Sequence, residues 1–127
     1  MSAEAKEWRA KAEDDYRVAL RELRARRQPS YDAACFHAQQ CVEKYLKATL
    51  VQHGITPRKI HDLATLMRDC LTWHPLWSTM TGDLELLSQY AVAARYPGET
   101  ATREKARAAI AAMQRCRSEI LENLVAK

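Results

Sequence analysis

The stretch FHAQQCVEKYLKATL, from Phe36 to Leu50, decides the fold. On a wheel of about 100° per residue, small and apolar side chains fall on one side of a helix. They are Ala34, Cys35, Ala38, Val42, Tyr45, Leu46 and Thr49. The opposite side carries His37, Gln40, Glu43, Lys44 and Lys47. The pattern predicts an amphipathic helix whose polar side is either a solvated face or a ligand-binding wall, and the favourable i,i+4 pair of Glu43 and Lys47 suits the solvated face.

Start and stop signals on both sides bound this helix. Ser30 is the expected N-cap, with Asp32 in the first turn. Gly54 suits the left-handed residue that ends a helix, and Pro57 prevents an immediate restart. We therefore expect the helix to run from about Ser30 to His53.

Four further helices are predicted from apolar side chains at helical spacing. Their expected bounds are about Ala3 to Arg26, from after His61 to His74, from Thr81 or Asp83 to Tyr96, and from Thr100 or Thr102 to about Val125. The segment WHPLWSTMTG, residues 73–82, is the least regular and is expected to cap the bundle or to contact a second subunit. Short connections predict an all-α, up-and-down bundle of about five helices, with residues 1–127 as a single domain.

The composition fits a globular helical protein. Residues AVILMFWYC make up 47% of the chain, and only 3 glycines and 4 prolines interrupt the helix formers. No apolar run is long enough for a membrane span, and the polar N-terminus is unlike a signal peptide, so we expect a cytoplasmic protein. The four cysteines, Cys35, Cys41, Cys70 and Cys116, show no C-x-x-C pair and are expected to be free, mostly buried thiols.

The formal net charge is +4, a mild excess that permits contact with phosphate groups. Arg21, Arg24, Arg26 and Arg27 gather at the end of the first expected helix. Cations at a helix C-terminus interact favourably with its dipole, and this interpretation is preferred over phosphate binding.

Several motifs together resemble the HEPN domain (higher eukaryotes and prokaryotes nucleotide-binding). They are Phe36-His37-Ala38-Gln39-Gln40, Glu43-Lys44, Leu46-Lys47-Ala48, Gly54, His61-Asp62-Leu63 and Ala94-Arg95-Tyr96-Pro97. The resemblance spans nearly the whole chain and implies a helical bundle that forms a homodimer and pairs with a nucleotidyltransferase-type partner protein, as a toxin pairs with its antitoxin. It also implies a nucleotide- or RNA-binding role. The residues expected to bind are His37, Gln40, Lys44, Lys47, His61, Asp62, Arg95 and Tyr96.

Many HEPN proteins are ribonuclease toxins with an Arg-x4-6-His motif, which this chain contains as Arg68 to His74. Arginine can hold a phosphate while histidine transfers a proton, so this pair gives the alternative of a metal-independent ribonuclease. About one such match is expected by chance in a chain with this many arginines and histidines. A further alternative is a structural dimerisation partner without a ligand.

The other candidate residues have structural interpretations as well. His61 is expected as a helix cap and Asp62 as a residue that interacts with the helix dipole. Arg95 and Tyr96 end a helix before Pro97, and His53 is interpreted as a simple helix-end residue. No P-loop, acid pair, Ser-His-Asp arrangement or metal-ligand cluster is present, so we expect no cofactor and no metal.

Overall fold

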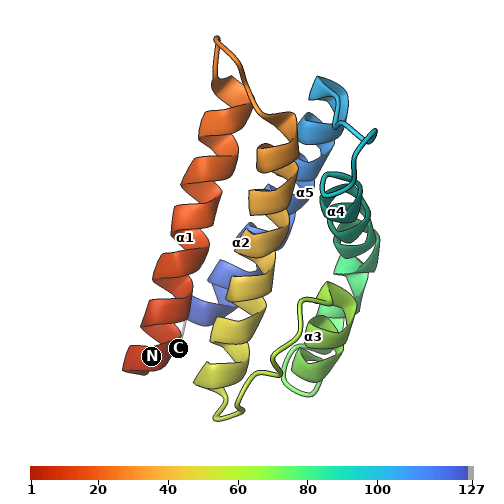
Figure 1. Cartoon of the computed structure of the whole chain (residues 1–127). Helices are drawn as coiled ribbons and strands as arrows, with labels where there is room; N and C mark the ends of the chain where they lie inside the picture. The colour runs from red at the N-terminus through yellow and green to blue at the C-terminus, as the bar shows by residue number, and fades with distance from the viewer. Residues whose placement is uncertain (126–127) are drawn as a thin grey trace.

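The computed structural model describes residues 1–125, and that part of the chain contains helices and no strand. The elements are α1 (Ala3–Arg24), α2 (Tyr31–Gln52), α3 (Leu63–Cys70), the short 3₁₀ helix η1 (Pro75–Met80), α4 (Thr81–Ala93) and α5 (Arg103–Val125). Long helices run side by side along one direction, and the start of α1 and the end of α5 lie at the same end of the bundle (Figure 1). The predicted all-α bundle is confirmed.

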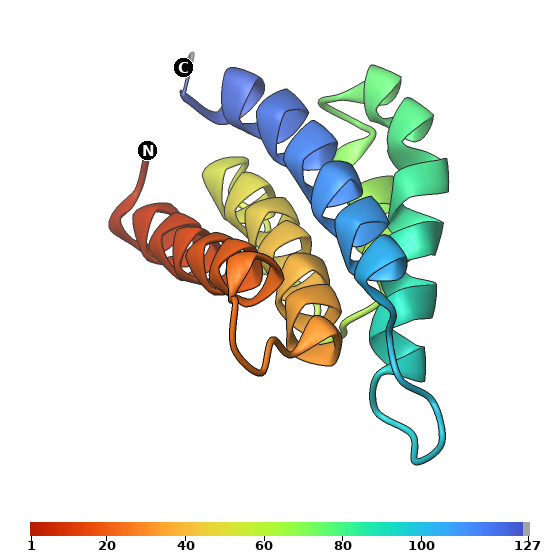
Figure 2. The ribbon, with the colours of Figure 1, turned by 90° about the horizontal axis from the view of Figure 1, so that it is seen from above.

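Helix α2 occupies the middle of the bundle, with α1 on one side and α4 and α5 on the other (Figure 2). Its bounds follow from the expected caps. The Ser30 hydroxyl accepts a hydrogen bond from the Ala33 amide at 3.1 Å, and Gly54 takes a φ of 78° after the last turn. Both end signals therefore act as predicted.

The expectation of a solvated polar side of α2 is wrong for Glu43 and Lys47, while His37, Gln40 and Lys44 are half-buried. Glu43 is 2% exposed and Lys47 is 6% exposed, and 13 of the 22 residues of α2 are buried. The helical wheel did not predict this burial because other helices cover α2 on both sides. A wheel assumes that one side of the helix faces water. The polar residues of α2 must therefore find partners inside the protein.

The region from residue 53 to residue 82 differs in detail from the prediction. The N-cap of α3 is Asp62 and not His61, and the Asp62 side chain accepts a hydrogen bond from the Thr65 hydroxyl at 2.6 Å. Helix α3 ends at Cys70, four residues before His74. Residues 75–80 form η1, which begins at Pro75 because proline suits the first position of a helix. Helix η1 leads directly into α4. Trp77 of η1 is buried in the core.

One core joins all the helices. Its largest fully buried side chains include Trp77, Tyr45, Leu46, Leu66, Leu84, Met113 and Ile120. All four cysteines are buried and free, as predicted. Burial raises the pKa of the Cys35 thiol to about 11 and that of the Cys70 and Cys116 thiols to about 12. The thiols are therefore protonated at neutral pH and pack as small apolar groups.

None of the helices in residues 1–125 combines the length and the apolar character that a membrane crossing needs.

The buried Glu43–Lys47 pair gives a stability prediction. We expect Lys47→Ala to lower the free energy of unfolding by about 3 kcal/mol, because it leaves the Glu43 carboxylate buried without its lysine. The double variant Glu43→Leu/Lys47→Met should lose less than about 1 kcal/mol, since apolar side chains of similar size can replace a buried ion pair. Urea denaturation measures both values.

Arg17→Ala is the matched control, because it breaks the ion pair of Arg17 with Asp14 on the exposed side of α1. It should cost less than about 0.5 kcal/mol. A double variant less stable than Lys47→Ala would contradict the prediction.

Candidate functional site

A buried carboxylate on α1 holds two of the polar residues of α2. Asp15 is 7% exposed, and its Oδ1 lies 2.8 Å from Nδ1 of His37. Lys44 donates a hydrogen bond from its Nζ to Asp15 Oδ2 at 2.6 Å. Asp15 therefore orients the imidazole of His37 and neutralises the charge of Lys44.

A second buried carboxylate, Glu43, lies further along α2. Lys47 Nζ is 3.2 Å from Glu43 Oε2, and His61 Nδ1 is 3.0 Å from Glu43 Oε1. Gln39 Nε2 donates to the His61 carbonyl at 3.0 Å, which ties the segment before α3 to α2. Lys47 also lies 5.4 Å from the ring centroid of Trp8 on α1. These contacts fill the hydrogen-bonding capacity that burial would otherwise leave unused.

Lys44 and Lys47 thus do not form an open cationic wall. Their ammonium groups are paired with carboxylates, so they offer little net charge to a phosphate. The exposed members of the predicted site are His61, whose side chain is 69% exposed, Asp62, Arg95 and Tyr96, while His37 and Gln40 are partly exposed. Whether these residues bind a ligand stays a prediction.

Arg95 and Tyr96 follow the end of α4, in the turn between Ala93 and Glu99. The Arg95 guanidinium lies 5.4 Å from the centroid of the Phe36 ring, and Phe36 packs edge-on against His37. Tyr96 is 61% exposed. The structure therefore brings the predicted residues Arg95 and His37 into one region, since both lie against the Phe36 ring.

His74 lies away from Arg95, in a ring cluster that sequence reasoning missed. Its Nε2 is 3.1 Å from Nε2 of His53, at the end of α2. The His74 ring stacks on Trp77 with centroids 4.1 Å apart, and the His53 ring stacks on Trp73 at 4.5 Å. An N–H···N bond between two imidazoles needs one nitrogen to donate and the other to accept, so the two Nε2 atoms cannot both carry a proton. His53 is therefore more than a helix-end residue.

The alternative catalytic pair has unequal surroundings. Arg68 is exposed, and its Nε donates to the Ala64 carbonyl at 3.3 Å. His74 is 7% exposed and has Trp77 on one face of its ring. A general base must reach the proton that it removes, and burial of His74 limits that reach in one copy of the chain.

A third polar cluster joins α1, α2 and α5. Arg117 donates two hydrogen bonds to Glu13, at 2.8 and 2.7 Å, and its guanidinium lies 4.1 Å from the ring centroid of Tyr16. The Tyr45 hydroxyl also donates to Glu13. The Arg117 guanidinium lowers the pKa of the Glu13 carboxyl below its usual value of 4.5. No sequence spacing signals this cluster, because Glu13 and Arg117 are 104 residues apart.

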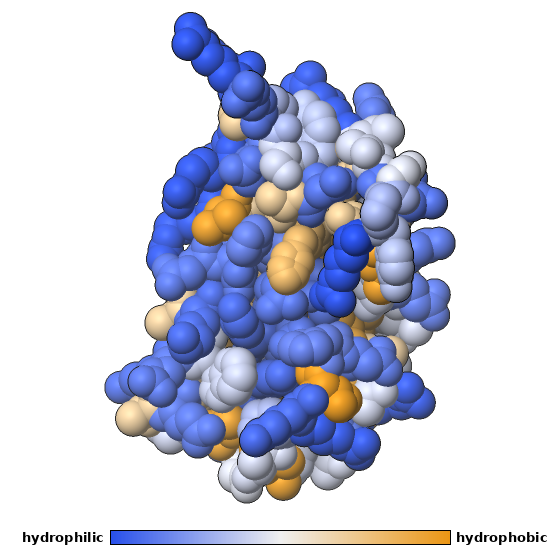
Figure 3. Space-filling view, in the orientation of Figure 1, coloured by the Kyte–Doolittle hydropathy of each residue, from blue (hydrophilic) through white to orange (hydrophobic). Residues whose placement is uncertain are grey.

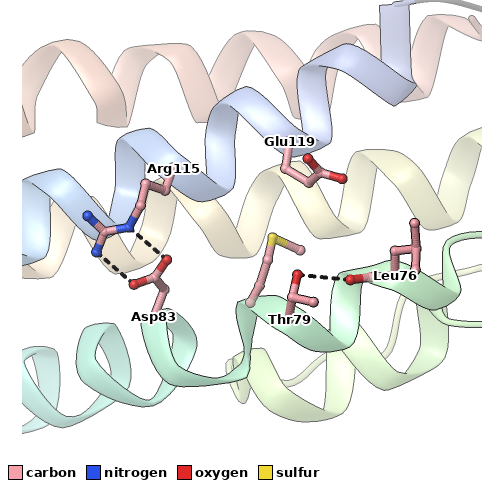
Figure 4. Close-up of a pocket in the computed structure, with 6 residues that line it drawn as sticks. Leu76, Thr79, Asp83, Arg115 and Glu119 are labelled. Atoms are coloured by element: carbon pink, nitrogen blue, oxygen red, sulfur yellow. Dashed lines mark hydrogen bonds and ion pairs between the residues drawn. The ribbon is translucent and has the colours of Figure 1, made fainter.

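The hollow between α4 and α5, of about 420 Å³, is a poor site for an anion. Figure 4 shows that Arg115 is turned to Asp83, with two hydrogen bonds of 3.0 and 2.8 Å between them. The Asp83 carboxylate raises the pKa of Arg115 and neutralises its charge. Leu76 and Glu119 also line the hollow.

The face over α1, α2 and α4 is mainly hydrophilic, and its apolar side chains are scattered (Figure 3). Within residues 1–125 no group of three or more His, Cys, Asp or Glu side chains has the geometry of a metal site.

The comparisons with known proteins agree with this helical architecture. The model of the HEPN domain family matches residues 5–124. The chain belongs to the HEPN family. A crystal structure of TT1696 from Thermus thermophilus is similar with a TM-score of 0.83 and 24% identity, over 95% of this chain and 98% of that one. A structure titled ST0689, an archaeal HEPN homologue, has a TM-score of 0.74 and 25% identity, over 94% and 97% of the two chains.

One curated relative is also similar to this HEPN protein. The protein named "Putative toxin MJ1304", from Methanocaldococcus jannaschii, is 31% identical over 94 residues. The match covers 68% of this chain and 59% of the relative. The HEPN resemblance of the sequence is therefore confirmed at the level of the family and the fold.

The Glu13 cluster predicts a pH dependence. Because the folded-state pKa of Glu13 is lowered, its contribution to stability is present above pH 4.5 and is lost as the pH falls through the folded value. We expect Glu13→Gln to be less stable than the native chain at pH 7 and to lose less stability between about pH 5 and pH 3. Urea titrations across that range measure the slopes.

Asp14→Asn is the matched control, since Asp14 is the exposed neighbour of Glu13. Parallel stability curves for the native chain and Glu13→Gln would show that the cluster does not act in this way.

Proposed function

We propose that this HEPN protein is one member of a toxin–antitoxin-type pair and acts as a homodimeric, nucleotide- or RNA-binding module that engages a nucleotidyltransferase-type partner. Two findings support the proposal: the HEPN family match over residues 5–124 and the toxin name of the curated relative. The match spans 59% of the relative's length, so a toxin role for this chain is a proposal.

One observation carries the ligand-binding part of the proposal, namely the position of the Arg95 guanidinium over Phe36 and the contact of Phe36 with His37. Guanidinium groups bind phosphate oxygens in pairs, and exposed aromatic rings stack on bases. Arg95 would hold a phosphate, and Tyr96 would stack on the base. His37 is held by Asp15, so it would reach the ligand in a fixed orientation.

The remaining predicted residues divide into two groups. The first group is Gln40 on α2 and His61 and Asp62 just before α3, which we propose contact the ligand. Lys44 and Lys47 act as positioning residues, because their ammonium groups hold Asp15 and Glu43 in place.

Exposed apolar side chains support assembly with a second copy or a partner protein. Leu76 is 77% exposed and Val92 is 51% exposed. Apolar side chains of this size at the surface favour contact with another protein, although single ones are common.

The ribonuclease alternative rests on the Arg68 to His74 motif, in which Arg68 would hold a phosphate and His74, 3.1 Å from His53 between their Nε2 atoms, would transfer a proton. The alternative of a structural dimer without a ligand predicts no response to nucleotides.

A thermal-shift experiment tests the nucleotide site. In 5 mM ATP we expect the melting temperature of the native chain to rise by about 3–6 °C, since a ligand that binds only the folded state stabilises it. Arg95→Ala should reduce the rise to less than about 1 °C, because the phosphate loses its guanidinium. Lys59→Ala removes the same charge from an exposed position and should keep the full rise. An equal shift in Arg95→Ala would reject this site, and no shift in the native chain would favour the ligand-free alternative.

An RNA-cleavage assay tests the alternative. Because His74 is buried, we expect the native chain to cleave a labelled RNA no faster than Arg68→Ala/His74→Asn does, with both at the rate of buffer alone. Cleavage by the native chain that falls by more than about 100-fold in the double variant would establish the ribonuclease instead.

A further inference from the structure

The net charge of the protein is concentrated at one end of the bundle. Residues 21–32 and 95–107 contain 8 arginines and lysines against 4 aspartates and glutamates, a net +4 that equals the charge of the whole chain. The connection between α1 and α2 and the start of α5 lie together at the end opposite the termini (Figure 1). The rest of the protein is therefore neutral overall, and this end attracts anions.

A hollow of about 560 Å³ lies at this end, where α1 stops and α5 begins. It is lined by the arginines Arg24, Arg26, Arg103 and Arg107 and by Tyr31. The sequence placed the first two of these at a helix C-terminus, and the fold adds two more from α5. Four guanidinium groups around one hollow repel each other unless an anion lies between them.

These four arginines make no ion pair with any carboxylate in residues 1–125. Two nearby carboxylates are engaged in backbone hydrogen bonds: Glu22 accepts from the Ser30 amide at 2.9 Å and Asp32 from the Ala101 amide at 2.7 Å. By contrast, Arg115 and Arg117 are each paired with a carboxylate through two hydrogen bonds. The hollow thus keeps its positive charge available for a ligand.

A second hollow, of about 520 Å³, continues the first along α1. It is lined by Arg17, Arg21 and Arg24, so Arg24 belongs to both. Arg17 is paired with Asp14, whereas Arg21 and Arg24 have no carboxylate partner in residues 1–125. From Arg17 to Arg24 the helix rises by about 10 Å, which is longer than a single phosphate group. An elongated row of cations fits a ligand with several phosphates along a line.

We infer that these two hollows, the arginine track, bind the sugar–phosphate backbone of a single-stranded nucleic acid. The guanidinium groups contact successive phosphates, and the ring of Tyr31 stacks on a base. Arg95 lies at the same end of the bundle but lines neither hollow, so the inference holds even if the Arg95 site fails its test.

Fluorescence anisotropy with a labelled 12-nucleotide single-stranded RNA at 50–200 mM NaCl tests the inference. The four arginines of the first hollow, with one phosphate contact each, contribute a slope of log K against log salt of about −2.8 in the native chain. Arg24→Gln/Arg103→Gln/Arg107→Gln should reduce the slope to about −0.7 and weaken binding by more than about tenfold at 100 mM. Lys6→Gln/Lys11→Gln/Lys59→Gln removes the same charge from positions elsewhere and should keep a slope near −2.8.

Competitors distinguish the sources of the anion. A single-stranded DNA of the same length should also bind, since the contacts are to phosphates, whereas millimolar tripolyphosphate and polyglutamate should displace the RNA poorly. Displacement by either at micromolar concentration would overturn the inference in favour of a small polyphosphate or an acidic protein. Equal binding by the arginine and lysine variants would overturn it as well.

A melting curve would reveal whether the triple variant fails to fold, and in that case a double variant replaces it. Arg26→Gln/Arg107→Gln changes two exposed residues and should still reduce the slope by about 1.4. An unchanged slope in that double variant would overturn the inference.

Discussion

The structure depends on the pairing of two buried carboxylates with the helix at its centre. The Asp15 and Glu43 carboxylates are accommodated inside the protein because Lys44, Lys47 and the imidazoles of His37 and His61 pair with them. A buried charge without such partners would destabilise the fold by several kcal/mol, of the order of 3–5. The pairs also have a direction, since each lysine reaches one particular carboxylate. The contacts of Asp15 on α1 with His37 and Lys44 on α2 therefore favour one packing of these two helices over a rotated one, which apolar contacts alone would tolerate.

This pairing separates the polar residues of the protein into two kinds. Between the helices, cations and carboxylates match one another, as in the half-buried Glu13–Arg117 pair and the more exposed Asp83–Arg115 pair. At the end where α1 meets α5, arginines gather without carboxylate partners in the described residues 1–125. Internal charges that are already matched contribute to folding, while those left unmatched at the surface are available to a ligand. The charges that can recognise a ligand are therefore those that have no partner in the folded protein.

The sequence predicted the helices and their ends well, because caps and apolar spacing act locally. Ser30 and Gly54 bounded α2 as expected. The burial of Lys47 was not predicted, since it depends on which helices surround α2. One signal was present: α2 has 4 Asp, Glu, Lys or Arg among its 22 residues, while α1 has 12 among 22. So few charges indicate a helix covered on several sides. The His53–His74 contact and the joining of Arg24 to Arg103 in one hollow had no local signal, because tertiary packing brings those residues together.

The start of α1 and the end of α5 lie at the same end of the bundle, which decides where a tag or a fusion partner would be attached. Both emerge from the bundle opposite the arginine track (Figure 1). An affinity tag or a fluorescent fusion at either end would thus leave the arginine track accessible. Molecules immobilised through such a tag would present the track to the solution.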